Sequence, residues 1–172
     1  GNFVDINHDG TVIAFNYNTS STSSTYIYEC AIGSETWTQI GTIADMRRGM
    51  SLSKDGYTIL TSKYQDKAQI WTYSGTGTTW NLKGGNIIPT SNKGGFHNNN
   101  VISNDGNVVI LSEKWWDITG KTDCGRIRIY YYDGSSWTNI KNIEGEIANE
   151  QLGNYSINAT GDLSKIIVGG LN

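Results

Sequence analysis

Asp5-Ile6-Asn7-His8-Asp9-Gly10 is the stretch of sequence that decides the fold, because the chain repeats it. Ser51–Gly56 and Val101–Gly106 follow the same order, and Ser156–Gly161 follows it more loosely. The closing glycines, at positions 10, 56, 106 and 161, are 46, 50 and 55 residues apart. Such spacings are typical of chains built from tandem structural repeats.

Each copy of this phrase is followed by a short apolar run. Runs rich in β-branched residues and bounded by turn residues predict buried strands. Asp-Gly between two such segments favours a tight hairpin, because type I′ turns need positive φ at both central positions. Each repeat therefore begins with a short strand, a tight turn and a buried strand. The apolar runs are Val12–Phe15, Tyr57–Leu60, Val108–Leu111 and Ile166–Val168.

Three of the four repeats continue with a second pair of strands. In Arg126–Tyr132 isoleucines alternate with arginines, which predicts a half-buried third strand near the periphery. A tryptophan opens each fourth strand, and we expect it to be a wedge between neighbouring repeats, because large aromatic side chains dominate packing energetics. The other third strands are Tyr26–Cys30 and Ala68–Tyr73, and the fourth strands are Trp37–Ile40, Trp80–Leu82 and Trp137–Ile140.

Four antiparallel strands in about 40–50 residues per repeat predict the blades of an all-β β-propeller. We assign residues 1–172 to one propeller segment of about 3.5 blades, with blades at 1–48, 49–98 and 99–153 and a half-blade at 154–172. A closed propeller needs roughly four to eight blades. We therefore expect a longer chain, or a second subunit, to complete the ring.

The third repeat carries a family resemblance. Gly125–Tyr130, Gly134–Trp137, Ile143–Glu146 and Gly153–Ile157 resemble FG-GAP-like repeat proteins, which are similar to the propeller of integrin α-subunits. The resemblance implies a propeller on a cell surface, in a secreted assembly or on a virion. It also implies a calcium loop, of which Asp5, Asn7 and Asp9 match the first half while Ile13 replaces the final acidic residue.

Calcium is the weaker interpretation of that loop, since a hard cation needs six to eight oxygen ligands. Side chains of Asn, Asp and Ser also bond turn amides, which is the alternative we favour. We therefore expect no cofactor, with calcium at Asp5, Asn7 and Asp9 as the competing hypothesis.

The composition restricts the kinds of partner that we expect this chain to bind. Thirteen basic and 16 acidic residues give a net charge of −3, and without a basic cluster larger than Arg47-Arg48 no nucleic-acid footprint is expected. No segment of the sequence resembles a membrane span. A surface rich in Asn, Ser, Thr and Gly favours an extracellular or virion surface. Cys30 and Cys124 fall in different blades, so we expect two unpaired thiols.

Catalytic patterns are weak. His8 occupies a variable turn position, no Gly-x-Ser-x-Gly elbow occurs, and the sialidase Asp-box spacing fails at Asp55-Gly56 and Asp105-Gly106. We therefore expect a protein that is not an enzyme. A glycoside-processing enzyme with catalytic carboxylates partly outside this chain is a weaker alternative.

Binding function tends to lie in loops that depart from the repeat. Trp115 and Trp116 lie in an insertion at Glu113–Asp123, and Phe96 and His97 end a long glycine-rich connection that begins at Asn92. We expect these four residues to contact a ligand. The alternatives are that at least one of the two indoles caps a neighbouring blade and that the connection only joins two blades. The predicted function is a non-catalytic scaffold or adhesion module that binds a protein, with a glycan-binding, lectin-like propeller as the alternative.

Overall fold

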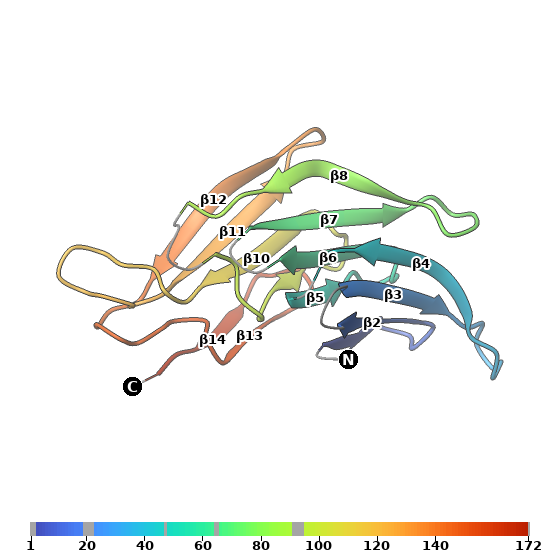
Figure 1. Ribbon diagram of the computed structural model, residues 1–172, viewed down its shortest axis with the longest axis horizontal. Coiled ribbons are helices and arrows are strands. Elements are labelled where there is room, and N and C mark those ends of the chain that lie inside the picture. Colours follow the sequence, from blue (N-terminus) through green and yellow to red (C-terminus); the bar gives the residue numbers. More distant parts are fainter. Residues whose placement is uncertain (1–2, 19–22, 47, 64–65, 91–94, 172) are drawn as a thin grey trace.

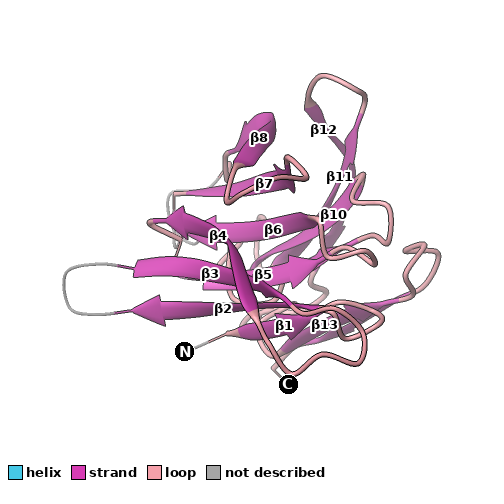
Figure 2. Ribbon diagram, turned by 90° about the vertical axis from the view of Figure 1, so that its right-hand side faces the viewer, coloured by secondary structure: helices cyan, strands magenta, loops and turns pink. Residues whose placement is uncertain are grey.

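The computed structural model describes residues 3–18, 23–46, 48–63, 66–90 and 95–171, and all regular elements in these ranges are strands (Figures 1 and 2). None of them forms a helix long and apolar enough to cross a membrane. The strands form three four-stranded sheets and one two-stranded sheet. Every sheet is antiparallel.

The strands of each sheet follow chain order. Sheet 1 contains β1 (Val4–Ile6), β2 (Val12–Asn18), β3 (Ser23–Glu29) and β4 (Thr38–Ala44). Sheet 2 contains β5 (Arg48–Leu52), β6 (Thr58–Lys63), β7 (Lys67–Tyr73) and β8 (Trp80–Ile87). Sheet 3 contains β9 (Val101–Ile102), β10 (Val108–Glu113), β11 (Arg126–Tyr132) and β12 (Trp137–Glu144). Sheet 4 contains β13 (Ser156–Ala159) and β14 (Ile166–Gly169).

This arrangement is three blades and the inner half of a fourth blade of a β-propeller, and the predicted fold class is confirmed. Two apolar cores separate the complete blades: one lies between sheets 1 and 2, and the other between sheets 2 and 3. β5 begins at Arg48, the last residue of the range expected for the first blade.

The wedge role predicted for the tryptophans is confirmed at both junctions between complete blades. Trp80 Nε1 donates to the carbonyl of Ile40 in sheet 1 at 2.8 Å, and Trp137 Nε1 donates to the carbonyl of Lys83 in sheet 2 at 2.8 Å. Each indole thus fixes a fourth strand to the fourth strand of the preceding blade. Trp37, which directly precedes β4, is 40% exposed.

Backbone hydrogen bonds also join the hairpin turns of successive blades. The amide of His8 donates to the carbonyl of Lys54 at 3.3 Å, that of Lys54 to Asn104 at 3.1 Å, and that of Asn104 to Gly161 at 2.7 Å. The variable position of the repeated phrase therefore has a constant structural task, which uses the backbone and leaves the side chain free to vary.

The fourth copy of the phrase was aligned wrongly as Ser156–Gly161. Asp162 Oδ1 accepts a hydrogen bond from the hydroxyl of Thr160 at 2.6 Å, as Asp105 does from the serine two residues before it at 2.5 Å. Leu163, with φ +55°, takes the position of the closing glycine. The true copy lies two residues later, and the glycine that guided the alignment occupies the variable position.

Candidate interaction site

The insertion between β10 and β11 lies beside the connection that leads from β8 into β9. The amide of His97 donates to the carbonyl of Ser112 on β10 at 2.9 Å, which places Phe96 and His97 next to the start of the insertion. The structure therefore brings together the two segments that depart from the repeat. Residues 91–94 of the connection lie outside the described residues.

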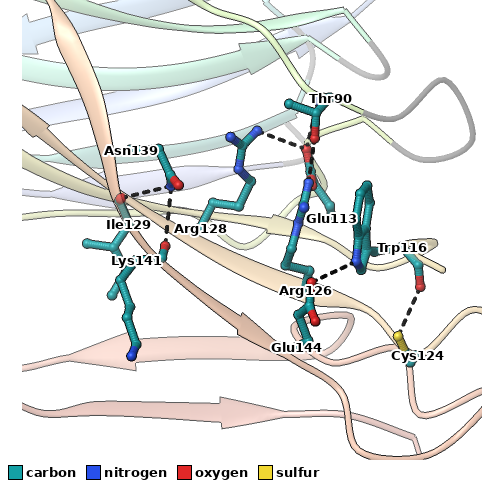
Figure 3. A network of polar contacts seen from close by, with 10 residues as sticks. All are labelled: Thr90, Glu113, Trp116, Cys124, Arg126, Arg128, Ile129, Asn139, Lys141 and Glu144. Atoms are coloured by element: carbon teal, nitrogen blue, oxygen red, sulfur yellow. Dashed lines mark hydrogen bonds and ion pairs between the residues drawn. The ribbon is translucent and has the colours of Figure 1, made fainter. Parts of the chain in front are cut away.

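A buried ion pair forms the base of this site. Glu113, at the end of β10, is fully buried, and Arg126, at the start of β11, is 5% exposed. Arg126 Nε donates to Glu113 Oε2 at 2.9 Å, Nη2 contacts the same oxygen, and Nη2 also donates to the hydroxyl of Thr90 at 2.6 Å (Figure 3). The pair thus ties the third blade to the connection that precedes it.

Arg128 adds a second buried cation. Its Nη1 lies 3.6 Å from Glu113 Oε1, and its guanidinium lies 4.9 Å from the centroid of the Tyr130 ring. Burial raises the pKa of Tyr130 to about 12, so its hydroxyl stays neutral. The buried Glu113 carboxylate therefore faces two guanidinium groups.

Sequence reasoning missed this cluster. Arg126 and Arg128 were expected on the solvated side of a half-buried strand, yet both are buried, at 5% and 7% exposure, while Ile129 is only half-buried. The correction has a physical reason, since Glu113 lies opposite Arg126 in the antiparallel register and supplies the counter-charge. A glutamate at the end of an apolar strand was the available signal.

Trp116 lies against this cluster. The Arg126 guanidinium carbon is 3.3 Å from the Trp116 ring centroid, and the indole Nε1 donates to Glu144 Oε1 at 3.1 Å (Figure 3). The Trp116 carbonyl accepts from the amide of Gly125 at 3.1 Å and from Cys124 Sγ at 3.2 Å. Trp116 is thus fixed on both its ring and its backbone.

Trp115 has fewer constraints. Its ring is half-buried, and Lys114 Nζ lies 4.4 Å from the ring centroid. The rest of the insertion is held in shape by Asp117, whose carboxylate accepts from the amide of Asp123 at 2.7 Å. The insertion therefore presents a half-exposed indole on a fixed backbone.

The other two predicted ligand residues lie deeper. Phe96 is fully buried in the core between sheets 2 and 3, where it packs as a core residue. His97 is 7% exposed, and burial, together with the charges of Lys114 and Arg48, lowers its pKa to about 4. The imidazole is therefore neutral at physiological pH.

The candidate calcium loop uses its oxygens for internal contacts. Asp5 Oδ2 accepts from the amide of Leu52 in the next blade at 2.7 Å, and Asp9 Oδ1 accepts from the hydroxyl of Thr11 at 2.6 Å. Asn7 Oδ1 accepts from the amide of Val12 at 2.9 Å. Over the described ranges, no group of three or more His, Cys, Asp or Glu residues is arranged to hold a metal ion.

No family model and no curated protein matches this chain. Solved β-propeller structures are similar to it. A functionally unknown protein from Desulfotomaculum acetoxidans is 18% identical with a TM-score of 0.65, over 96% of this chain and 47% of that one. The periplasmic gluconolactonase of Pseudomonas aeruginosa is 15% identical with a TM-score of 0.59, over 97% and 49%.

A third similar structure is prolyl oligopeptidase B from Galerina marginata, which is 15% identical with a TM-score of 0.55, over 97% of this chain and 24% of that chain. At these identities the likeness shows the fold alone. Enzymes and a protein of unknown function share it, so the fold does not select an activity. This chain spans about half the length of the first two structures.

Proposed function

We propose that this propeller is a non-catalytic interaction module of FG-GAP-like type, which binds a protein partner through Trp115 and the surface around it. The observation that carries the proposal is the contrast between the two adjacent tryptophans. Both indoles are half-buried, but Trp116 contacts Arg126 and Glu144, whereas Trp115 lies beside the flexible side chain of Lys114.

A rigid aromatic side chain on a fixed backbone loses little conformational entropy when it binds, and tryptophan is enriched among the residues that dominate interface energetics. The buried Glu113–Arg126 pair supports the proposal because it holds the base of the insertion. His97 supplies shape but no charge, since its pKa is about 4.

The test compares the wild-type chain with Trp115→Ala and with Tyr155→Ala, which removes an exposed aromatic side chain just before β13. Each immobilised protein is exposed to extracts of the source organism and to a glycan array. Protein capture that is lost in Trp115→Ala and retained in Tyr155→Ala is the expected result. Sugar binding that depends on Trp115 would replace the proposal by the lectin alternative, and capture that survives Trp115→Ala would reject the site.

A further inference from the structure

The two faces of sheet 1 are covered differently. Val12, Ala14 and Ile27 point to one face and are fully buried in the core shared with sheet 2. The residues that alternate with them point to the other face and are all half-buried or exposed. They are Ile13, Phe15, Tyr17, Tyr26 and Tyr28, and Trp37 is exposed at the start of β4.

This second face, the aromatic face, is organised. The Phe15 ring stacks on Tyr26 and on Tyr28 with centroid distances of 5.8 Å in both pairs, and Tyr28 donates its hydroxyl to Gln39 at 3.3 Å. Tyr17 is 55% exposed. Large apolar side chains gathered on one exposed sheet face mark a surface that another element covers.

The corresponding face is covered in the two blades that follow. In sheet 2 it carries Ile59 and Trp80, which belong to the core shared with sheet 1, and Trp71, which packs against that core. In sheet 3 it carries Leu111 and Tyr130, which belong to the core shared with sheet 2. The aromatic face of sheet 1 is therefore the surface that, in each later blade, receives the preceding blade.

Each covered junction has the same requirement of its partner strand. Gly41 lies four residues after Trp37, and a Cβ there would overlap the Trp80 indole. Gly84 lies four residues after Trp80, and a Cβ there would lie 2.8 Å from the Trp137 ring. A strand that accepts the next blade's tryptophan thus has the pattern Trp-x-x-x-Gly and offers the carbonyl of the residue before the glycine.

We propose that the aromatic face of sheet 1 docks a further repeat unit of this same sequence type, whose outer strand has the Trp-x-x-x-Gly pattern and accepts the Trp37 indole. The propellers to which this chain is similar have room for such units, since it spans 47% and 49% of two of them. The established junctions between sheets 1 and 2 and between sheets 2 and 3 supply the geometry.

A second copy of this chain fits less well. Its uncovered outer strand is β12, where Lys141 stands four residues after Trp137 in place of the glycine. In addition, β13 already lies beside β9, so the inner part of that flank is occupied. Self-association is therefore an outcome to be tested.

The experiment fuses residues 48–87, which contain Trp80 and Gly84, directly in front of residue 1 of the full chain. The three residues before β1 then equal in number the three that join β4 to β5. Hydrogen exchange of the Trp37 indole N–H is followed by NMR, with the signal assigned by its loss in Trp37→Phe. We expect exchange to slow by at least about tenfold, as for a group protected by stable packing.

Matched controls change only the added copy. Gly84→Val places a side chain where the indole must lie, whereas Gly85→Val changes a glycine whose Cβ would meet nothing within 4 Å. Slow exchange should persist with Gly85→Val and disappear with Gly84→Val. Equal protection of the Trp37 indole in both variants overturns the proposal that this indole docks over Gly84.

A second fusion guards against failure of the first added unit to fold. It places residues 3–44, with Gly41 in the accepting position, in front of residue 1. Unprotected Trp37 in both fusions overturns the proposal. Light scattering of the unfused chain supplies the remaining test, because a dimer in which Trp37 is already protected would assign the aromatic face to a second copy.

Discussion

The junction between sheets 1 and 2 and the junction between sheets 2 and 3 share one contact, the indole lock, in which a tryptophan packs over a glycine of the preceding blade. The two junctions differ in their charged residues. In both, an indole donates to a carbonyl of the preceding blade and lies over a glycine. The first junction keeps its charges outside, where Lys63 and Asp45 pair at 2.5 Å with side chains 33% and 56% exposed. The second buries Glu113 and Arg126 at 0% and 6% exposure.

This difference distinguishes the indole contact, which both junctions share, from the buried charges, which only the third blade contributes to its junction. The lock depends on backbone groups and one tryptophan, so it recurs. The buried charges occur where the chain carries the insertion with Trp115, and they hold that insertion in place. The second junction therefore combines the shared architecture with the only binding surface that we propose among the loops.

The largest expected effect separates the two ion pairs. Glu113→Ala removes the buried carboxylate that faces Arg126 and Arg128, and removing one partner of a buried pair typically costs about 3–5 kcal/mol of unfolding free energy. Lys63→Ala should change stability far less, because exposed pairs contribute little. Urea unfolding of both variants measures the contrast. Equal losses would show that burial of the second pair has no energetic consequence.

A smaller effect tests the lock itself. Gly84 and Gly85 both have positive φ, at +70° and +81°, so alanine strains the backbone at either position. Only at Gly84 would the new Cβ meet the Trp137 and Tyr132 rings, at 2.7–2.8 Å. Overpacking of this kind typically costs about 1–3 kcal/mol.

Gly84→Ala should therefore lower the free energy of unfolding by more than Gly85→Ala, and the difference is attributable to the indole. Thermal melting of both variants beside the wild-type chain provides the measurement. Identical melting temperatures would mean that the glycine is present for backbone conformation alone.

The comparison also explains which features the sequence predicts. Strand order, blade count and the tryptophan wedges follow from local signals, namely Asp-Gly turns, β-branched runs and a tryptophan after each glycine turn. The burial of Arg126 does not, because it depends on Glu113 lying opposite in a register that only pairing reveals. The fourth turn was misplaced because Gly161 imitates the closing glycine, whereas Leu163 adopts the positive φ.

Only part of the candidate site could be predicted, again because local sequence signals do not reveal contacts between different strands. The break in the repeat identified Trp115 and Trp116, since an insertion is visible as extra length. Nothing local distinguishes their roles, because Trp116 is committed by contacts to Arg126 and Glu144 that come from different strands. Phe96 was expected to contact a ligand, yet its ring belongs to a core that only the folded chain assembles.

The smallest effect at neutral pH concerns His97, which lies beside the second junction. Burial and the nearby cations Lys114 and Arg48 lower its pKa to about 4, against about 6.5 in an unfolded chain. Between these two values the unfolded state binds a proton that the folded state does not, so stability falls as the pH falls from about 6.5 to about 4. Above pH 7 the contribution of this group is constant.

His97→Asn should remove this part of the pH dependence while leaving any dependence due to carboxylates, whose titration continues below it. His8→Asn is the matched control, because His8 lies exposed in a hairpin turn of the first blade. Urea unfolding at intervals between pH 7.5 and pH 4 then gives three curves. A His97→Asn curve with the wild-type slope between pH 6.5 and pH 4 would contradict the prediction. It would mean that burial and the charges of Lys114 and Arg48 do not lower the pKa of His97.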